Sequence, residues 1–423
     1  MVPPCGGTRA VTGAVTAAAR GMVAEAWCAQ GLFLALALYG LLSVPAPPAL
    51  RATEITIGVL LGLAVGVRRP LYVLTGHALS ESGTARWELP AILAFAWLLW
   101  APMMRGVWVG WAPADMLRDV VPLFFLFLPV FLVPLLRANA DRAAKLLACG
   151  MMIAGLGFAL RWWKQVGWGF GAVGSRVMAD GAAYLLNAPS VLFAGIALPL
   201  AGFGLAARGG PLRWMAALVC FAGGALCLAA LAGAVHRMAL GLAIAAFLAV
   251  APWWARRAPL AVGAAALVLA AVLLGLSDAV LGALLKVAEK TRLAGANTRW
   301  EEAAAMLDLA VSSPEMFLFG HGWGALVANP AVGGWRVSYT HTLPTYALTK
   351  AGALGLVALA AYLGGLASGA LAVLRCDPPL GWAVLPPLVM ALCAHTSFKY
   401  LDTGILLTLM LLVAERRNAL SSA

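Results

Sequence analysis

The sequence predicts an all-α protein that crosses a membrane many times. Only 11% of its 423 residues are charged and 63% are hydrophobic, whereas a soluble globule carries about 25% charged residues. Because such a small number of charged side chains cannot cover a water-facing surface, lipid must be the solvent for much of the chain. The apolar runs are continuous and do not alternate with polar residues, which favours helices over a transmembrane β-barrel.

About twelve apolar runs have a length suited to crossing a bilayer. Each is bounded by charges or by Pro/Gly clusters and is close to the roughly 20 residues that a transmembrane helix needs. The second run is short and the tenth is long. We expect helices at about 27–46, 53–67, 88–104, 119–136, 144–162, 183–205, 213–233, 238–255, 258–282, 346–374, 380–396 and 403–414.

Basic residues occur at every second junction between these runs. If the N-terminus is cytoplasmic, the even-numbered helices end in the cytoplasm, and each of those junctions is basic, as the positive-inside rule expects. Both termini are then cytoplasmic. The junction residues are Arg68, Arg69, Arg137, Arg142, Lys145, Arg208, Arg213, Arg256, Arg257, Arg375, Arg416 and Arg417.

The opposite face carries cations that the topology does not require. A net charge of +12 suggests nucleic acid in a soluble protein, but in a membrane protein the side that the charges occupy matters first. This excess predicts an anionic ligand at the outer face, with lipid phosphates as the alternative for some residues. The outer basic residues are Arg51, Arg105, Arg118, Arg161, Lys164, Arg176, Arg237, Lys286, Lys290, Arg292, Arg299 and Arg336.

A long outer segment divides the chain into three parts. Residues 1–282 hold nine predicted helices, residues 283–345 form the outer segment, and residues 346–423 hold three more helices. Within the outer segment, Thr298 and Glu301 have capping-box spacing. Apolar residues from Trp300 to Val311 then repeat at helical spacing. This pattern predicts an amphipathic helix of about three turns on the membrane surface, ended near Pro314.

Two histidines follow the amphipathic helix. His321 lies among three glycines within residues 317–324, and this arrangement predicts a tight turn that lets the backbone approach a ligand closely. His341 lies just before the tenth helix, at about the point where the chain re-enters the bilayer. The N-terminus of a helix favours anions, so an anionic group could bind nearby.

These residues resemble the C-terminal signature of the O-antigen ligases and O-antigen polymerases. The signature combines a Gly-His-Gly turn, here residues 320–322, with a histidine before a helix that continues with two glycines, here His341, Gly352 and Gly355. The resemblance covers about residues 230–365. One departure is Thr342, because members of this family commonly have asparagine directly after the histidine.

Two basic positions extend the resemblance. Arg299 opens the surface helix, and His236-Arg237 stands at the mouth of the eighth helix. The family commonly has a Ser-Arg-Gly-like sequence at the second position, where this chain has His236-Arg237-Met238.

The resemblance implies a GT-C-like glycosyltransferase in the bacterial inner membrane, with its active site on the periplasmic face. The donor would be a glycan on undecaprenyl diphosphate, and the acceptor of a ligase would be a sugar hydroxyl of lipid A–core. The partners are therefore these two lipids and the bilayer, and no nucleic acid is expected. A repeat-unit polymerase and an O-linked oligosaccharyltransferase share this chemistry and differ in their acceptor.

The reaction needs a base for the attacking hydroxyl and positive charge for the leaving diphosphate. Imidazole suits the first task, and guanidinium suits the second through bidentate phosphate contacts. We expect His341 to act as the base. Inversion follows if no covalent glycosyl-enzyme forms. The expected diphosphate ligands are Arg161, Arg237 and Arg299, and secondary candidates are His236, His321, Lys164, Arg176, Asp180 and Arg336.

Several of these residues have simpler interpretations. His341 could cap a turn, and a structural role in the turn is favoured for His321. Arg161 precedes Trp162-Trp163 and could anchor the chain at the interface. Arg299 could pair with a glutamate of its own helix. His236 could equally be a base or a passive interface residue, and His395 has no supporting context.

The remaining charges have local explanations. Lys350 lies inside the tenth run, so it faces a polar cavity or the helix begins later. Lys399 and Asp402 flank the last outer turn and are expected to form a local pair. The 17 acidic residues are scattered without an Asp-x-Asp on the outer face, so neither a metal nor another cofactor is expected.

A transporter or flippase is the competing class. Such proteins usually carry ionisable residues at mid-bilayer and have repeated halves with broken helices. Here the middles of the runs are nearly free of charge, Lys350 excepted, and the sequence has no convincing internal repeat. The polar residues gather instead in the outer loops, which favours an enzyme at the membrane interface.

Overall fold

The protein is a bundle of helices with one very short hairpin. The computed structural model describes residues 27–47, 51–78, 87–167, 183–275, 282 and 298–421. Its longer helices are Trp27–Leu42, α2 (Ala52–Val65), α3 (Arg68–Leu74), α5 (Glu88–Val109), α6 (Pro113–Leu126), α7 (Leu128–Leu136), α8 (Ala140–Gln165), α11 (Pro189–Ala207), α12 (Pro211–Gly233), α13 (Arg237–Arg257), α14 (Pro259–Gly275), α16 (Thr298–Ala310), α18 (Leu343–Cys376), α19 (Pro378–Val389) and α20 (Leu401–Ser421).

Short elements connect these helices. They are η1 (Arg137–Asn139), α10 (Ala183–Leu186), α17 (Pro314–Phe319), η2 (Pro330–Val332), η3 (Met390–Ala394) and η4 (Thr396–Lys399). The element η3 is a single π-helical turn. The strands β1 (Val327–Ala328) and β2 (Arg336–Val337) pair antiparallel, with Val327 opposite Val337.

The predicted all-α membrane class is confirmed at the level of helix length and apolarity. Within the described residues, six helices are long and apolar enough to cross a membrane, counting the run Pro113–Gln165 as one. A seventh is added if α2 and α3, which meet at an angle of 78°, are taken as one bent span. Two shorter apolar helices, Trp27–Leu42 and Pro378–Ala394, fall where the first and eleventh runs were expected. The total of about twelve spans stays a prediction.

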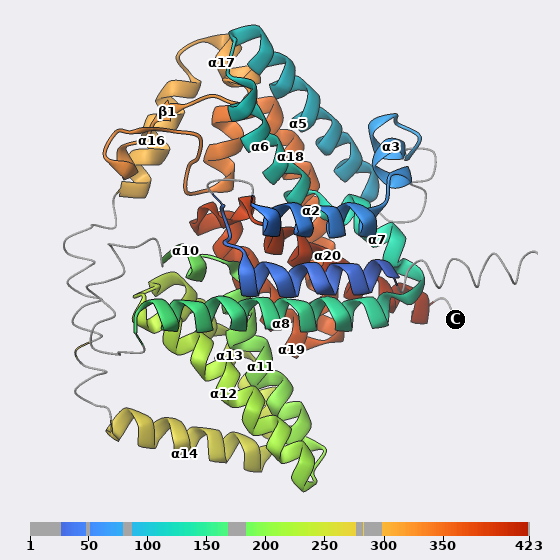
Figure 1. Cartoon of the computed structure of the whole chain (residues 1–423), viewed down its shortest axis with the longest axis vertical. Coiled ribbons are helices and arrows are strands. Elements are labelled where there is room, and N and C mark those ends of the chain that lie inside the picture. Colours follow the sequence, from blue (N-terminus) through green and yellow to red (C-terminus); the bar gives the residue numbers. More distant parts are fainter. Residues whose placement is uncertain are drawn as a thin grey trace, which may run out of the picture.

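Helix α20 forms the centre of the bundle. Residues 401–414 are buried without interruption, and apolar side chains occur on every side of this part of the helix. A helix that is apolar all round is expected to be enclosed by other elements. Here α6, α7, α8, α18 and α19 surround it. In Figure 1, α5, α6 and α18 lie above this centre and α11, α12 and α13 lie below it.

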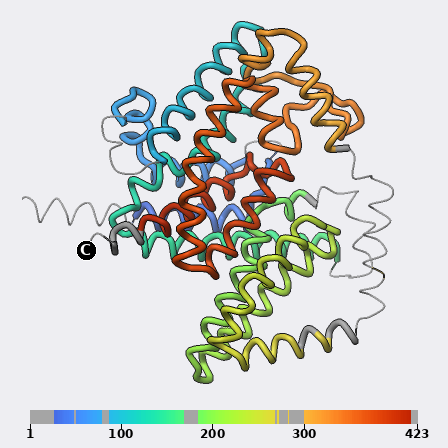
Figure 2. The backbone as a smooth tube through the Cα atoms, turned by 180° about the vertical axis from the view of Figure 1, so that it is seen from behind, coloured from blue at the N-terminus to red at the C-terminus, as the bar shows by residue number. Residues whose placement is uncertain are grey.

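The outer segment and the ends of several helices share one side of the bundle. In Figure 1, α10, β1 and α16 lie toward the left, whereas α7 and the end of α20 lie toward the right. Figure 2 shows the same separation from behind, with the orange segment that contains α16 and the hairpin on the side away from the end of α20. The outer segment and α10 therefore lie at the end of the bundle away from the end of α20.

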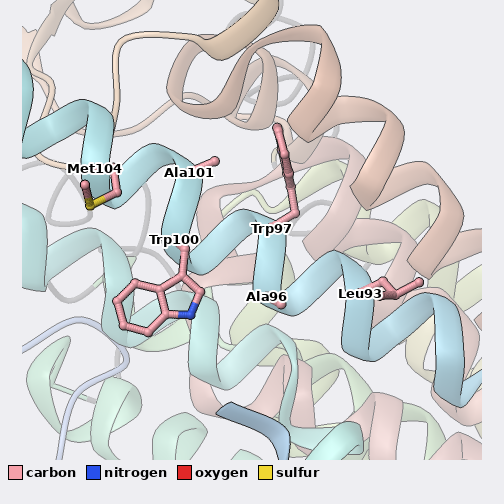
Figure 3. Close-up of a pocket in the computed structure, with 6 residues that line it drawn as sticks. All are labelled: Leu93, Ala96, Trp97, Trp100, Ala101 and Met104. Carbon is pink, nitrogen blue, oxygen red and sulfur yellow. The ribbon is translucent and has the colours of Figure 1, made fainter. Parts of the chain in front are cut away.

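An apolar groove runs along α5 on the outside of the molecule. Figure 3 shows that it is built from one face of that single helix. Its lining contains no charged side chain, so it cannot neutralise a diphosphate. Exposed tryptophans and aliphatic residues are what a surface in contact with lipid requires. The lining residues are Leu93, Ala96, Trp97, Trp100, Ala101 and Met104.

Candidate active site

Helix α16 brings a carboxylate into the protein. The predicted helix of about three turns is confirmed, since α16 spans 13 residues. Its apolar stripe points outward, with Trp300 76% and Val311 56% exposed. The opposite face is buried at Glu302, Met306 and Ala310, which follow one another at intervals of four residues. An apolar outer face and a buried charge suit a helix that lies against lipid.

Glu302 holds His341 at three points. Its Oε2 lies 2.9 Å from His341 Nδ1, and the backbone N–H of His341 donates to Oε1 and Oε2 at 3.1 and 3.2 Å. The amide of Asn329 donates to Oε1 at 2.5 Å. The Glu302 side chain is 1% exposed, whereas that of His341 is 22% exposed. A fully enclosed carboxylate therefore fixes an imidazole that remains open on its other side.

The pairing sets the charge of Glu302 and the tautomer of His341. Burial alone would raise the pKa of Glu302, but hydrogen bonds from His341 and Asn329 hold it below its ordinary value, so the group is ionised at neutral pH. An ionised carboxylate can only accept, so Nδ1 carries a proton, and in the neutral form of the ring Nε2 presents its lone pair. The arrangement is suited to general-base chemistry at Nε2.

His341 lies at the start of a helix, as predicted. Helix α18 begins at Leu343, and Thr342 is its N-cap, accepting a hydrogen bond from the backbone of Thr345 at 3.4 Å. Threonine and asparagine are both good N-cap residues. The departure from the family pattern at Thr342 therefore preserves the cap that orients the chain after His341.

The Gly-rich turn around His321 approaches another part of the protein. Gly320, Gly322 and Gly324 have φ values of 70°, 83° and 88°, which favour glycine. A Cβ on Gly320 would lie 2.6 Å from the backbone nitrogen of Gly352. The sequence suggested that this turn approaches a ligand closely. In the structure the turn packs so tightly against α18 that any side chain at Gly320 would collide with that helix.

A break in α18 explains this contact. Gly352 has a φ of 67° inside the helix, which frees carbonyls in the preceding turn. The backbone N–H groups of His321 and Gly322 donate to the carbonyls of Thr349 and Lys350, each at 2.9 Å. The turn thereby supplies hydrogen-bond donors for two carbonyls that the break in α18 leaves free. Burial and nearby cations lower the pKa of His321, so its ring is neutral at neutral pH.

A buried ionic cluster fastens the outer segment to the bundle. The carboxylate of Asp119 accepts from Lys350 Nζ at 2.5 Å, Lys399 Nζ at 3.3 Å and the Tyr346 hydroxyl at 2.9 Å. It also accepts from the backbone N–H of Gly324 at 3.0 Å. We call Asp119, Tyr346, Lys350 and Lys399 the Asp119 cluster. Asp119 and Lys350 are almost completely buried.

Each of the two lysines also donates a hydrogen bond to a backbone carbonyl of the outer segment. Lys350 donates to the carbonyl of Ala325 at 2.5 Å, and Lys399 donates to the carbonyl of Ser338 at 3.0 Å. Lys350 thus faces a polar cluster, one of the two alternatives from the sequence. The expected local pair of Lys399 with Asp402 is wrong, since Asp402 instead accepts from the backbone N–H of Ser190 at 3.1 Å.

Arg299 lies within electrostatic range of both Glu302 and Arg237. Arg237 begins α13, and Arg299 lies in the first turn of α16. Partial loss of water and the nearby charge of Arg237 lower the pKa of Arg299, while Glu302 acts in the opposite direction. The guanidinium groups of two separate elements therefore act on one another electrostatically, and an anion bound near both would relieve their repulsion.

The turn that presents Arg237 is strained. Val235 has a φ of 55°, the only positive φ of a non-glycine residue in the described part of the chain. A β-branched residue in this region costs on the order of 1–3 kcal/mol, and such residues cluster at functional sites. The strain places His236 and Arg237 at the very start of α13.

His395 lies near His236 and within electrostatic range of Arg299 and His341, which the sequence did not indicate. Its ring centroid lies 5.8 Å from that of His236. Burial, together with His236, Arg299 and His341, lowers its pKa to about 3. His395 directly follows the π-helical turn η3, and such turns are frequent at functional sites. Its position at the end of an apolar run gave no signal, because its neighbours are distant in sequence.

The other predicted ligands bond to backbone carbonyls, are exposed, or fall outside the described residues. Arg161 donates to the carbonyl of Gly40 at 3.1 Å and to that of Ser43, at the end of helix Trp27–Leu42. It therefore satisfies free carbonyls of a helix end. Lys164 is exposed in the last turn of α8, and Arg336 donates to the carbonyl of Leu326 within the hairpin region. Arg176 and Asp180 lie outside the described residues.

The chain was compared with known protein families and with curated proteins, and neither comparison gives a match.

Proposed function

We propose that this chain is a membrane glycosyltransferase that moves a glycan from undecaprenyl diphosphate to a sugar hydroxyl of lipid A–core. In this proposal the protein has a GT-C-like fold and crosses the bacterial inner membrane about twelve times, with both termini in the cytoplasm and the active site on the periplasmic face. One observation carries it: a buried carboxylate fixes His341 through Nδ1 and its backbone N–H, and Arg299 lies within electrostatic range of that carboxylate and of Arg237.

The reaction follows from these groups. Nε2 of His341 removes the proton of the acceptor hydroxyl, and the oxygen attacks the anomeric carbon of the donor sugar. The bond between that carbon and the diphosphate oxygen breaks, and both bonding electrons leave with the diphosphate. Arg237 and Arg299 stabilise the negative charge that develops there. Direct attack from the opposite side inverts the anomeric centre.

The test is a transfer assay with purified protein, an undecaprenyl-diphosphate glycan and lipid A–core, followed by gel shift. We expect wild type to form product, and His341→Ala to be about 100- to 10,000-fold slower because the base is lost. Arg237→Ala and Arg299→Ala are each expected to be about 10- to 1000-fold slower, because less charge then stabilises the leaving group.

The matched control is His77→Ala. His77 is an exposed histidine that forms a hydrogen bond with Thr75 and contacts the ring of Tyr72. This variant should retain wild-type activity. Full activity of His341→Ala would refute the assigned base. If wild type instead lengthens the lipid-linked glycan and leaves lipid A–core unchanged, the protein is a repeat-unit polymerase. Substrate-coupled proton or sodium flux in proteoliposomes would favour the transporter class.

Chelation provides a further prediction. We expect EDTA to leave the transfer rate unchanged, because two guanidinium groups can neutralise the diphosphate without a divalent cation. Among the described residues, no group of three or more His, Cys, Asp or Glu side chains could hold a metal ion. The measurement is the transfer rate before and after EDTA treatment. A loss of activity that Mg²⁺ or Mn²⁺ restores would contradict this prediction.

A further inference from the structure

Two imidazoles beside the proposed active site have no role in the proton transfer described above. The rings of His236 and His395 lie 5.8 Å apart, with an interplanar angle of 43°. Each is delivered by irregular backbone: His236 follows Val235, whose φ is 55°, and His395 follows the π-helical turn η3. Irregular backbone of this kind concentrates at functional sites. Its occurrence on both elements suggests that the pair has a function.

His395 carries an atom that lacks a partner. Its Nδ1 is buried and makes no hydrogen bond within the described part of the chain. Buried polar atoms in folded proteins almost always have a partner, so an exception calls for a ligand or another explanation. The ring is neutral at neutral pH, because burial, with smaller contributions from its neighbours His236, Arg299 and His341, lowers its pKa to about 3.

A neutral imidazole limits the chemistry of the ligand. It cannot help to neutralise a diphosphate, and Arg237 and Arg299 already supply positive charge. One nitrogen donates a hydrogen bond and the other accepts, which matches a hydroxyl group that can do both. His341 lies within electrostatic range of His395, and the attacking hydroxyl must approach His341. Sugar hydroxyls of the acceptor would therefore come close to the imidazole pair.

We propose that His395, flanked by His236, forms a subsite for the acceptor glycan, in which Nδ1 of His395 hydrogen-bonds to a sugar hydroxyl. The inference rests on the proposed glycosyltransferase function and adds the group that recognises the acceptor. His395 binds and orients the acceptor, while His341 remains the base. The donor diphosphate is bound independently by the arginines.

The kinetic test varies one substrate while the other saturates. We expect His395→Phe to raise the KM for lipid A–core about 10- to 100-fold, the range for one lost hydrogen bond in a buried site, and to leave the KM for the undecaprenyl-diphosphate glycan unchanged. His395→Gln keeps a side chain that can donate and accept, so it should recover part of the loss. His77→Phe is the matched control. A rise in the KM for the donor alone, or no change in either KM, overturns the proposal.

A binding measurement separates this proposal from the transfer reaction. Protein labelled with ¹⁵N-histidine in detergent micelles is titrated with delipidated core oligosaccharide and, separately, with inorganic pyrophosphate. The resonance of His395, assigned by its loss in His395→Phe, should shift with the oligosaccharide and not with pyrophosphate. A shift with pyrophosphate alone, or with neither, refutes the acceptor subsite. A shift with the oligosaccharide in a protein that transfers nothing supports the subsite and refutes the proposed function.

Discussion

Replacing Glu302 with glutamine is expected to lower kcat by about 100- to 10,000-fold while leaving the fold intact, as removal of a carboxylate that orients a catalytic imidazole does in other enzymes. Glutamine has nearly the same shape, so the backbone contact to His341 can persist. Its amide can present N–H groups to Nδ1, which would move the imidazole proton to Nε2. The nitrogen that should act as the base would then have no lone pair.

The control for this prediction lies on the same helix. Glu301 precedes Glu302 and is exposed, so Glu301→Gln removes the same charge from α16 without touching His341. It should retain wild-type kcat. The measurement is the transfer rate at saturating donor and acceptor, with thermal unfolding recorded for each variant. Equal rates for Glu302→Gln and Glu301→Gln would show that the carboxylate does not set the tautomer.

The same pair has a defined dependence on pH. The folded protein holds the pKa of Glu302 below its ordinary value of 4.5. A depressed carboxylate pKa stabilises the folded state fully above the unfolded value, and this contribution is lost as the pH falls through the folded value. We therefore expect the ionised carboxylate of Glu302 to stabilise the protein throughout the neutral range and to stop doing so only in acid.

Local features of the site could be predicted from the sequence. Helix α16 was predicted from its apolar spacing and its end at Pro314, and His341 was placed at a helix start because a polar loop meets an apolar run there. Arg237 and Arg299 were chosen because their places, at the starts of the eighth and of the surface helix, resemble those of basic residues in the O-antigen ligase signature. All of these signals lie within a few residues of the feature that they predict.

The pairings across the site could not be predicted in this way. Glu302 binds His341 across 39 positions, Lys350 binds Asp119 across 231, and Lys399 binds Asp119 across 280. Periodicity says nothing about such distances, so Lys399 was assigned to the nearest carboxylate, Asp402. Arg161 was judged by its side of the membrane, while its actual partners are carbonyls of the first helix.

The Asp119 cluster leads to the largest expected effect on stability. Asp119→Leu removes the one carboxylate that accepts from both Lys350 and Lys399, and Lys350 is only 1% exposed. Breaking a buried ion pair by removing one partner costs about 3–5 kcal/mol, because the remaining charge has lost both water and its counter-ion. The variant should therefore unfold at a markedly lower temperature in detergent than wild type.

A double replacement distinguishes charge from packing. In Asp119→Leu/Lys350→Met the buried ammonium group of Lys350 is also removed, and replacing a whole ion pair by apolar residues is often neutral. We expect this variant to recover much of the lost stability, measured as the midpoint of thermal unfolding. Lys145→Met, which breaks an exposed pair with Asp141, is the surface control and should change little. Equal midpoints for the single and double variants would mean that the cost of Asp119→Leu comes from packing.

Recovery of stability need not restore activity. The double variant still lacks the Lys350 bond to Ala325, and Lys399 has lost the carboxylate that positions it against the carbonyl of Ser338, three residues before His341. A protein that is as stable as wild type but transfers glycan more slowly would show that the cluster positions the outer segment around the base. Wild-type activity in the recovered variant would limit its role to stability, because the Glu302–His341 contact would then keep its geometry without the anchor.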